Sequence, residues 1–285
     1  MAIQDIRRPP KRFIQALLDN VGSATAAGEL SRLGIRDPTM QGPVSHTPGV
    51  KIVGPAVTLQ FMPKREDLYG ESEYADPEKQ LHRHALYHAT AGDVVVVDAR
   101  GDMRSGVFGN MMLTYLKGKG GAGVVVDGCV RDFPIVKDLG LGLWLRGATP
   151  NYHTQTNLFP FAVNVPVACG GVLVMPGDII IADDDGAVVV PIKLANDLSE
   201  KARHHAEWEE FSRMRLEQGG DLRTYYPLSE KGWREYIAWC KKQGRPHPGA
   251  RPIRGAPPPT VTRQEKAGKA DPRRGSPGEE PSRRR

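Results

Sequence analysis

The residues with the clearest chemical use are Arg131 and Asp132, at the end of the stretch "GVVVDGCVRDFP" (123–134). An apolar run and a small-residue turn deliver a fixed positive charge and a carboxylate side by side. Arginine offers a planar fork of donors to a carboxylate or phosphate, and aspartate is a hard oxygen ligand suited to Mg²⁺ or Mn²⁺. The pair fits a site for a small anion that a metal polarises. A surface Arg–Asp pair, with Asp132 capping the next helix, explains the same spacing at least as well.

A second loop is expected at the same edge of the sheet. The stretch "DARGDMRSGVFG" (98–109) follows the apolar run 94–98 and leads into a helix predicted over 109–120. Ligands of open βαβ layers gather at the carboxyl ends of parallel strands. The free N–H groups and the positive dipole end of a helix starting near Gly109 suit a carboxylate or phosphate.

Other groups of polar residues are weaker candidates. His84 and His88 are four residues apart on one predicted helix with His82, but no glutamate lies between them as in a metalloprotease signature and no third zinc ligand is evident. "DDDG" (183–186) lacks the spacing of a twelve-residue calcium loop. A hairpin turn between two apolar runs is the stronger interpretation of this segment.

The elements that must position these residues alternate between helix and strand. Apolar residues at helical spacing predict helices around 14–21, over 78–90 and over 109–120, and a short helix capped by Thr25. A long polar helix is predicted to begin at Pro191. Apolar, β-branched runs predict strands at 52–61, 94–98, 122–128, 143–146, 161–165, 167–174, 179–182 and 186–190. One helix between the strands at 94–98 and 122–128 makes a βαβ unit, and the later strands follow without helices. We therefore expect an α/β layered fold with mixed sheets and a long C-terminal helix.

Charge and composition point to a soluble, cytoplasmic protein. The formal net charge is +6, but residues 251–285 contain ten Lys/Arg and four Asp/Glu, so residues 1–250 are neutral. Nucleic-acid binding by the body is not indicated, and only a weak contact through the basic tail remains open. No apolar stretch reaches membrane-spanning length. Cys129, Cys169 and Cys240 have no metal-type spacing, as expected of a reduced protein. We predict one domain over 1–249 and a disordered Pro/Gly-rich tail over 250–285.

Several segments together resemble one known family. They are "GPAVTLQF", "AGDVVVVDARGD", "GVVVDGCVRD", "VNVPVACGGVLVMPGD" and "IIIADDDGAVVVP", which occur in consistent order. This pattern is similar to the family that includes the regulator of ribonuclease activity A and the 4-hydroxy-4-methyl-2-oxoglutarate aldolases. The resemblance implies a fold like the swivelling β/α/β domain of phosphohistidine enzymes, assembled as homotrimers or homohexamers with sites between subunits.

The resemblance also implies roles for particular residues. The family's turn, whose backbone amides hold pyruvate, falls on Gly109, Asn110, Met111 and Met112; its substrate-binding arginine falls on Arg131 and its aspartate ligand for Mg²⁺ or Mn²⁺ on Asp132. A glutamate from a neighbouring subunit, which reaches the metal's waters, would lie within "EWEEF" (207–211), with Glu210 the candidate. Asn110 departs from the family, whose aldolases have an acid there. An amide still hydrogen-bonds a water but brings no charge.

Two functions follow from the resemblance. The first is a metal-dependent lyase, an aldolase or decarboxylase that acts on a pyruvate-yielding 2-oxo acid such as 4-hydroxy-4-methyl-2-oxoglutarate or oxaloacetate. The second is a non-catalytic regulator that binds a ribonuclease through its surface. The retained Arg131–Asp132 pair behind Gly109 favours the enzyme, whereas Asn110 and the added tail weigh against it.

Overall fold

A computed structural model describes residues 3–67, 69, 75–153 and 156–246. Within these residues the main sheet has eight strands, in the order β1-β5-β4-β3-β2-β9-β10, with β6 pairing to β2. The neighbours β2, β3, β4 and β5 run parallel and the other pairs are antiparallel. The sheet is therefore mixed, as expected. Its strands are β1 Val44–Ser45, β2 Ile52–Pro63, β3 Val94–Gly106, β4 Gly123–Val130, β5 Gly142–Ala148, β6 Leu158–Val163, β9 Ile179–Asp183 and β10 Gly186–Val190.

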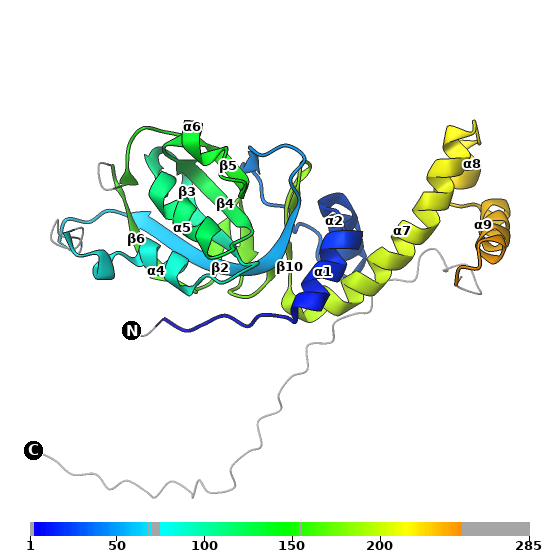
Figure 1. Ribbon diagram of the computed structural model, residues 1–285, viewed down its shortest axis with the longest axis horizontal. Helices are drawn as coiled ribbons and strands as arrows, with labels where there is room; N and C mark the ends of the chain where they lie inside the picture. Colours follow the sequence, from blue (N-terminus) through cyan, green and yellow to red (C-terminus); the bar gives the residue numbers. More distant parts are fainter. Residues whose placement is uncertain (1–2, 68, 70–74, 154–155, 247–285) are drawn as a thin grey trace, which may run out of the picture.

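The helices are α1 Lys11–Asn20, α2 Ser23–Arg32, α4 Leu81–His88, α5 Asn110–Gly118, α6 Phe133–Val136, α7 Ala195–Glu217, α8 Leu222–Tyr225 and α9 Glu230–Lys242. Helices α4 and α5 lie against the sheet, whereas α7 leads away from it to α8 and α9 (Figure 1). Short 3-10 turns, Pro77–Lys79 and Ile192–Leu194, precede α4 and α7. The stretch 167–174, expected as one strand, is the hairpin of β7 Val167–Cys169 and β8 Val172–Val174, because Gly170 and Gly171 both adopt positive φ. No helix among the described residues is long and apolar enough to cross a membrane.

The parallel strands are buried on both faces, which explains their continuous valine runs. On one face Val95, Val97, Val124 and Val126 pack with residues of α4 and α5. On the other, alternate residues such as Val96 and Val125 pack in a second core with Trp144 and the β7–β8 hairpin. Because successive side chains of a strand point to opposite faces, each run contributes to both cores.

Strand β3 is longer than its sequence predicts. The apolar run suggested that the strand ends at Asp98 and that a loop follows, but β3 continues to Gly106. Its register with β4 shifts between Val97 and Asp102 and again before Gly106. Arg100 and Gly101 have φ of 60° and 69°. At these two residues the pairing of β3 with β4 is interrupted, and it resumes at Asp102. This extension brings residues 102–106 alongside the end of β4.

The N-terminal helices and the start of α7 form a third core against β9 and β10. Helix α2 begins at Ser23, not after a Thr25 cap. Its N-cap residue is Gly22, and the Ser23 N–H donates to Asp183 Oδ2 at 2.7 Å. An aspartate distant in sequence therefore accepts the bond that a local cap would supply, so the sequence alone did not show where the helix starts.

The far half of α7 carries a separate structure, which we call the C-terminal arm (residues 205–246). Figure 1 shows α7 leading away from the sheet to α8 and α9. Phe211, Tyr225, Trp233 and Tyr236 form an aromatic core there that shares no residue with the other three. The predicted long polar helix is confirmed, although α9 was not predicted. The predicted disordered tail, 250–285, lies outside the described residues.

Candidate functional site

Arg131 and Asp132 lie where β4 ends, and Asp132 adopts an unusual conformation. It has φ 58° and ψ 30° in the left-handed region, which is unfavourable for a residue with a side chain and is typical of functional sites. Asp132 occupies the N-cap position of α6, yet its side chain makes no capping bond there. Its Oδ2 instead accepts the N–H of Asn110 at 3.0 Å. The carboxylate thus faces the start of α5. The alternative interpretation of Asp132 as a cap of the next helix is therefore wrong.

Gly109 permits this approach of α5 to the Arg–Asp pair. A Cβ added at Gly109 would lie 2.6 Å from Asp132 Oδ2 and 2.9 Å from Arg131 Nε. Both distances are too short for a carbon atom, so a larger residue would push the pair away from the helix. The structure therefore brings together Gly109, Asn110, Arg131 and Asp132, from the two loops that the sequence placed at one edge.

The N-terminus of α5 offers two free donors beside this carboxylate. Among the described residues none accepts a hydrogen bond from the backbone N–H of Met111 or Met112. The Met111 side chain is 73% exposed, whereas Met112 packs against the core. The Asn110 side chain accepts from Thr114 Oγ1 at 3.1 Å. Unpaired N–H groups at a helix start attract an anion.

The Arg131 guanidinium lies between Asp132 and Tyr152. Its Nε is 3.8 Å from Asp132 Oδ2, and its Cζ is 5.8 Å from the centroid of the Tyr152 ring. Its backbone N–H donates to the Phe108 carbonyl at 2.9 Å, which fixes the residue beside the end of β3. The Arg131 side chain is 40% exposed, so its charge is available to a ligand.

His153, next to Tyr152, is buried beneath the site. Its ring contacts the rings of His82 (4.5 Å between centroids) and Phe61 (5.6 Å). Burial lowers the pKa of His153 to about 4, and the positive charge of Arg131 contributes to the shift. Burial also lowers the pKa of His82, where the neighbouring His153 adds to the effect. Both imidazoles are therefore neutral at neutral pH. Sequence patterns gave no signal for Tyr152 or His153, since they follow β5 in an irregular segment.

The chemistry of Asp132 fits a hard divalent cation. Its side chain is 37% exposed, and its Oδ1 accepts no hydrogen bond from a described residue. Mg²⁺ is commonly held by one or two carboxylates while keeping several waters. The described residues contain no cluster of three or more His, Cys, Asp or Glu that could hold a metal. This chain would thus supply one direct ligand, and water or substrate would supply the others.

Glu210 does not join these residues within one chain. It lies on α7 in the C-terminal arm, where Arg245 Nη1 donates to its Oε2 at 2.6 Å. Arg245 also lies over the Trp239 ring, 4.8 Å from its centroid. A role for Glu210 in the site would need a second copy of the chain.

The other sequence candidates have structural partners. His84 Nε2 lies 2.7 Å from the Glu78 carbonyl, and His82 faces the protein interior. "DDDG" forms the hairpin turn between β9 and β10, which confirms that interpretation. Asp127, within β4, is paired with Arg146 of β5, and burial raises the pKa of Asp98 nearby.

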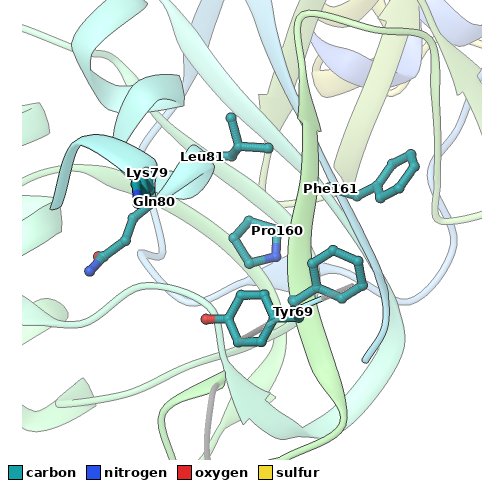
Figure 2. A pocket seen from close by; sticks show the side chains of 7 residues that line it. Tyr69, Lys79, Gln80, Leu81, Pro160 and Phe161 are labelled. Atoms are coloured by element: carbon teal, nitrogen blue, oxygen red, sulfur yellow. The ribbon is translucent and has the colours of Figure 1, made fainter. Parts of the chain in front are cut away.

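A separate hollow lies beside β6 (Figure 2). This cavity of about 290 Å³ is lined by residues of β6 and of the segment before α4, namely Tyr69, Lys79, Gln80, Leu81, Phe159, Pro160 and Phe161. None of the site residues around Asp132 lines it. It is mostly apolar, and it has no carboxylate for a metal.

Comparison with known proteins identifies the family. The family model described as "RraA-like: Aldolase/RraA" matches residues 16–189. A putative 4-hydroxy-4-methyl-2-oxoglutarate aldolase of Halalkalibacterium halodurans is 35% identical over 54% of this chain and 66% of its own length. The 4-hydroxy-4-methyl-2-oxoglutarate aldolase of Thermus thermophilus is 35% identical over 40% of this chain and 68% of its own. The match thus spans about two thirds of these relatives.

A solved structure agrees with the family match. Streptomyces coelicolor RraAS2, described as an unusual member of the RNase ES inhibitor RraA protein family, is 48% identical in sequence. The similarity covers 73% of this chain and 99% of RraAS2, with a TM-score of 0.66. The fold, the order of the motifs and these matches lead to one conclusion: the chain belongs to the RraA-like family.

Proposed function

We propose that this protein is a divalent-metal-dependent lyase that cleaves a pyruvate-yielding 2-oxo acid, such as 4-hydroxy-4-methyl-2-oxoglutarate or oxaloacetate. The observation that carries the proposal is the convergence of three groups on one point. The Asp132 carboxylate is held by the Asn110 N–H, two further α5 N–H groups have no acceptor among the described residues, and the Arg131 guanidinium lies alongside. Aldolases among the family relatives support the same reaction class.

The chain's own groups account for binding of the substrate. The free N–H groups of Met111 and Met112 and the dipole of α5 bind the carboxylate of the 2-oxo acid. Asp132 would hold Mg²⁺ or Mn²⁺, which when bound supplies electrophilic stabilisation of developing negative charge. The amide of Asn110, in place of an acid, keeps the hydrogen-bonding capacity of this position and leaves the site with one fewer negative charge.

Arg131 would assist the bond cleavage itself. In an aldol cleavage the C3–C4 bond breaks, the C4 hydroxyl loses its proton and becomes a carbonyl, and the electron pair passes to the C2 oxygen as an enolate. In oxaloacetate the same electrons are released when carbon dioxide leaves. Arg131 stabilises the enolate oxygen by charge and hydrogen bonding, and protonation at C3 then yields pyruvate.

A pyruvate-release assay tests this proposal. Pyruvate is measured from oxaloacetate and from 4-hydroxy-4-methyl-2-oxoglutarate, with added Mg²⁺ and with EDTA. Asp132→Asn should lower turnover at least about a hundredfold, the scale of a lost electrostatic contact in a transition state. Asp138→Asn is the matched control, because Asp138 is an exposed acid of the same region. Full turnover in EDTA, or an active Asp132→Asn variant, would contradict the proposal.

A second function is favoured by one observation, the 48% identity to RraAS2 over 99% of that protein. We infer that inhibition of an RNase E-type ribonuclease by surface contact is the alternative. Adding the protein to a ribonuclease cleavage assay tests it. Inhibition that survives Asp132→Asn would show a surface function independent of the site, and no inhibition by either protein would exclude it for that ribonuclease.

We propose that the chain assembles as a homotrimer or homohexamer, in which Glu210 of one subunit approaches Asp132 of another. The support is that Glu210 belongs to α7, whose far half leads away from the sheet and from α5 and α6 (Figure 1). Light scattering gives the mass of the assembly directly.

We also propose a cytoplasmic location, since Cys129, Cys169 and Cys240 are all buried and free.

A further inference from the structure

The Arg131 guanidinium has few contacts that could fix its direction. Among the described residues it makes no hydrogen bond, and its 3.8 Å approach to Asp132 is longer than one. A flexible arginine loses rotamer freedom when it binds a ligand, and this loss weakens the binding. A site that relies on this guanidinium therefore needs another group to hold it in place.

Tyr152 is the group in position to do so. The Arg131 Cζ lies 5.8 Å from the Tyr152 ring centroid, within the distance at which a cation is attracted to a ring face. Tyr152 forms a parallel bridge with Gly106, and the neighbouring Asn151 carbonyl accepts the Gly106 N–H at 3.0 Å. The ring is therefore carried by a segment that is bonded to the extended end of β3.

Gly106 holds the segments of Tyr152 and Arg131 together. A Cβ at Gly106 would lie 2.7 Å from the Asn151 carbonyl oxygen and 2.9 Å from the Arg131 Cβ. The absence of a side chain therefore lets both segments contact the same residue. The tyrosine and the arginine are set against each other by the backbone and not only by their side chains.

His153 anchors the same segment from below. Its ring is 3% exposed and packs between Phe61 of β2 and His82 of α4. Tyr152 meets Arg131 at the site, and the following residue is inserted into the protein interior. Such an anchor limits the movement of the Tyr152 backbone.

We propose that Tyr152 is a positioning residue, whose ring holds the Arg131 guanidinium toward the carboxylate and enolate oxygen of a 2-oxo acid at the start of α5. This proposal rests on the proposed lyase function. Tyr152 does not touch the reacting atoms; it reduces the freedom of Arg131 before the substrate arrives. Its contribution should therefore depend on the aromatic face and not on the hydroxyl group.

Oxalate, a dianion that resembles the enolate of pyruvate, is the probe. Its affinity is measured by calorimetry with saturating Mg²⁺, and turnover of oxaloacetate is measured in parallel. Tyr152→Leu should weaken oxalate binding and lower kcat about two- to fivefold, the usual scale of an exposed cation–π contact. Tyr152→Phe should keep both. The Mg²⁺ concentration for half-maximal activity should not change in either variant, because Asp132 is untouched.

Tyr115→Leu is the matched control. Lys119 lies 5.7 Å from the Tyr115 ring centroid, so the same kind of contact is removed on the exposed side of α5. That variant should bind oxalate as the unmodified protein does. If the unmodified protein binds oxalate and releases pyruvate, and Tyr152→Leu binds oxalate equally well, the positioning role is wrong and the lyase proposal stands. If the unmodified protein neither binds oxalate nor releases pyruvate, both proposals fall.

Discussion

The sheet edge around Asp132 and the C-terminal arm are stabilised in different ways. At the sheet edge, backbone contacts hold polar side chains: the Asn110 N–H binds Asp132, and glycines at 106 and 109 let three segments meet. In the arm, aromatic side chains supply the contacts, with Phe211 packing against the rings of Tyr225 and Tyr236. The sheet edge lies inside the family match, 16–189, and the arm lies beyond it.

At the sheet edge the positions of the site residues must be exact, whereas the arm needs only a stable core. A site at a sheet edge depends on distances of a few tenths of an ångström, so its glycines tolerate no replacement. An aromatic core tolerates volume-conserving changes but not the loss of a ring. Mutations should therefore have different signatures in the two regions, with loss of activity at the sheet edge and loss of local stability in the arm.

The largest expected effect is in the arm. Phe211→Ala removes a ring that is 2% exposed and should cost about 3–5 kcal/mol of the arm's stability, as typical for a buried phenylalanine. Hydrogen exchange should show faster exchange across α8 and α9, with strands β3 and β4 still protected. Phe211→Leu, which keeps much of the volume, should lose less. Equal loss of protection in β4 would show that the arm and the sheet unfold together.

The histidines of the two regions should give opposite pH dependences, and His153 should give the larger effect. In the unfolded chain this imidazole takes up a proton below its ordinary pKa of 6.5, whereas burial lowers the pKa in the folded protein to about 4. Stability is therefore lost as pH falls through that window, by up to about 3 kcal/mol. Urea unfolding at several pH values checks this. His153→Asn should remove the part of this pH dependence of the unfolding free energy that His153 contributes, whereas the part from the buried His82, whose pKa is also lowered, should remain.

His205, at the base of the arm, should act in the other direction. It lies between the carboxylates of Glu29 and Glu209, with ring nitrogens 3.0 and 2.9 Å from their oxygens. The hydrogen bond to Glu29 raises the pKa of His205. Its contribution to stability is present below the unfolded pKa and is lost as pH rises through the raised value. His205→Gln should remove this loss, and a slope of the same sign as that of His153 would contradict the assignment.

A charge added at the sheet edge should have a smaller effect. Asn110→Asp adds a carboxylate near the start of α5. At an effective dielectric near 20 and a separation of about 5 Å, each pair of unit charges attracts by roughly 3 kcal/mol, and a divalent ion by about twice that, before desolvation and screening. A gain of about tenfold in Mg²⁺ affinity, near 1.4 kcal/mol, is the expected result. Calorimetric titration measures it directly.

Asn196→Asp, on the exposed side of α7, is the control for Asn110→Asp and should not change Mg²⁺ affinity. Tighter Mg²⁺ with retained turnover supports a conventional aldolase site. Tighter Mg²⁺ binding with lost turnover indicates that the natural substrate fits the amide of Asn110. The carboxylate of that substrate would then be repelled by the new carboxylate of Asn110→Asp. Unchanged Mg²⁺ affinity would show that Asn110 does not face the metal.

The sequence predicted the parts of this fold that depend on local patterns. Valine runs located β3 and β4, and the spacing of Gly109, Arg131 and Asp132 placed them at one edge of the sheet. It did not predict the extension of β3 to Gly106 or the left-handed Asp132, because both depend on contacts between segments distant in the chain. Tyr152 was missed for the same reason, since only the bridge to Gly106 brings it to Arg131.

The smallest expected effect is that of removing the basic tail. A chain that ends at Gly249 loses the segment that holds the whole net charge of +6. We propose that residues 1–249 form one domain and that the tail adds little to its stability, because a segment so poor in large apolar residues buries too little surface to offset its ordering entropy. The melting temperature and the mass of the assembly should stay the same. A drop of several degrees would show that the tail packs on the body.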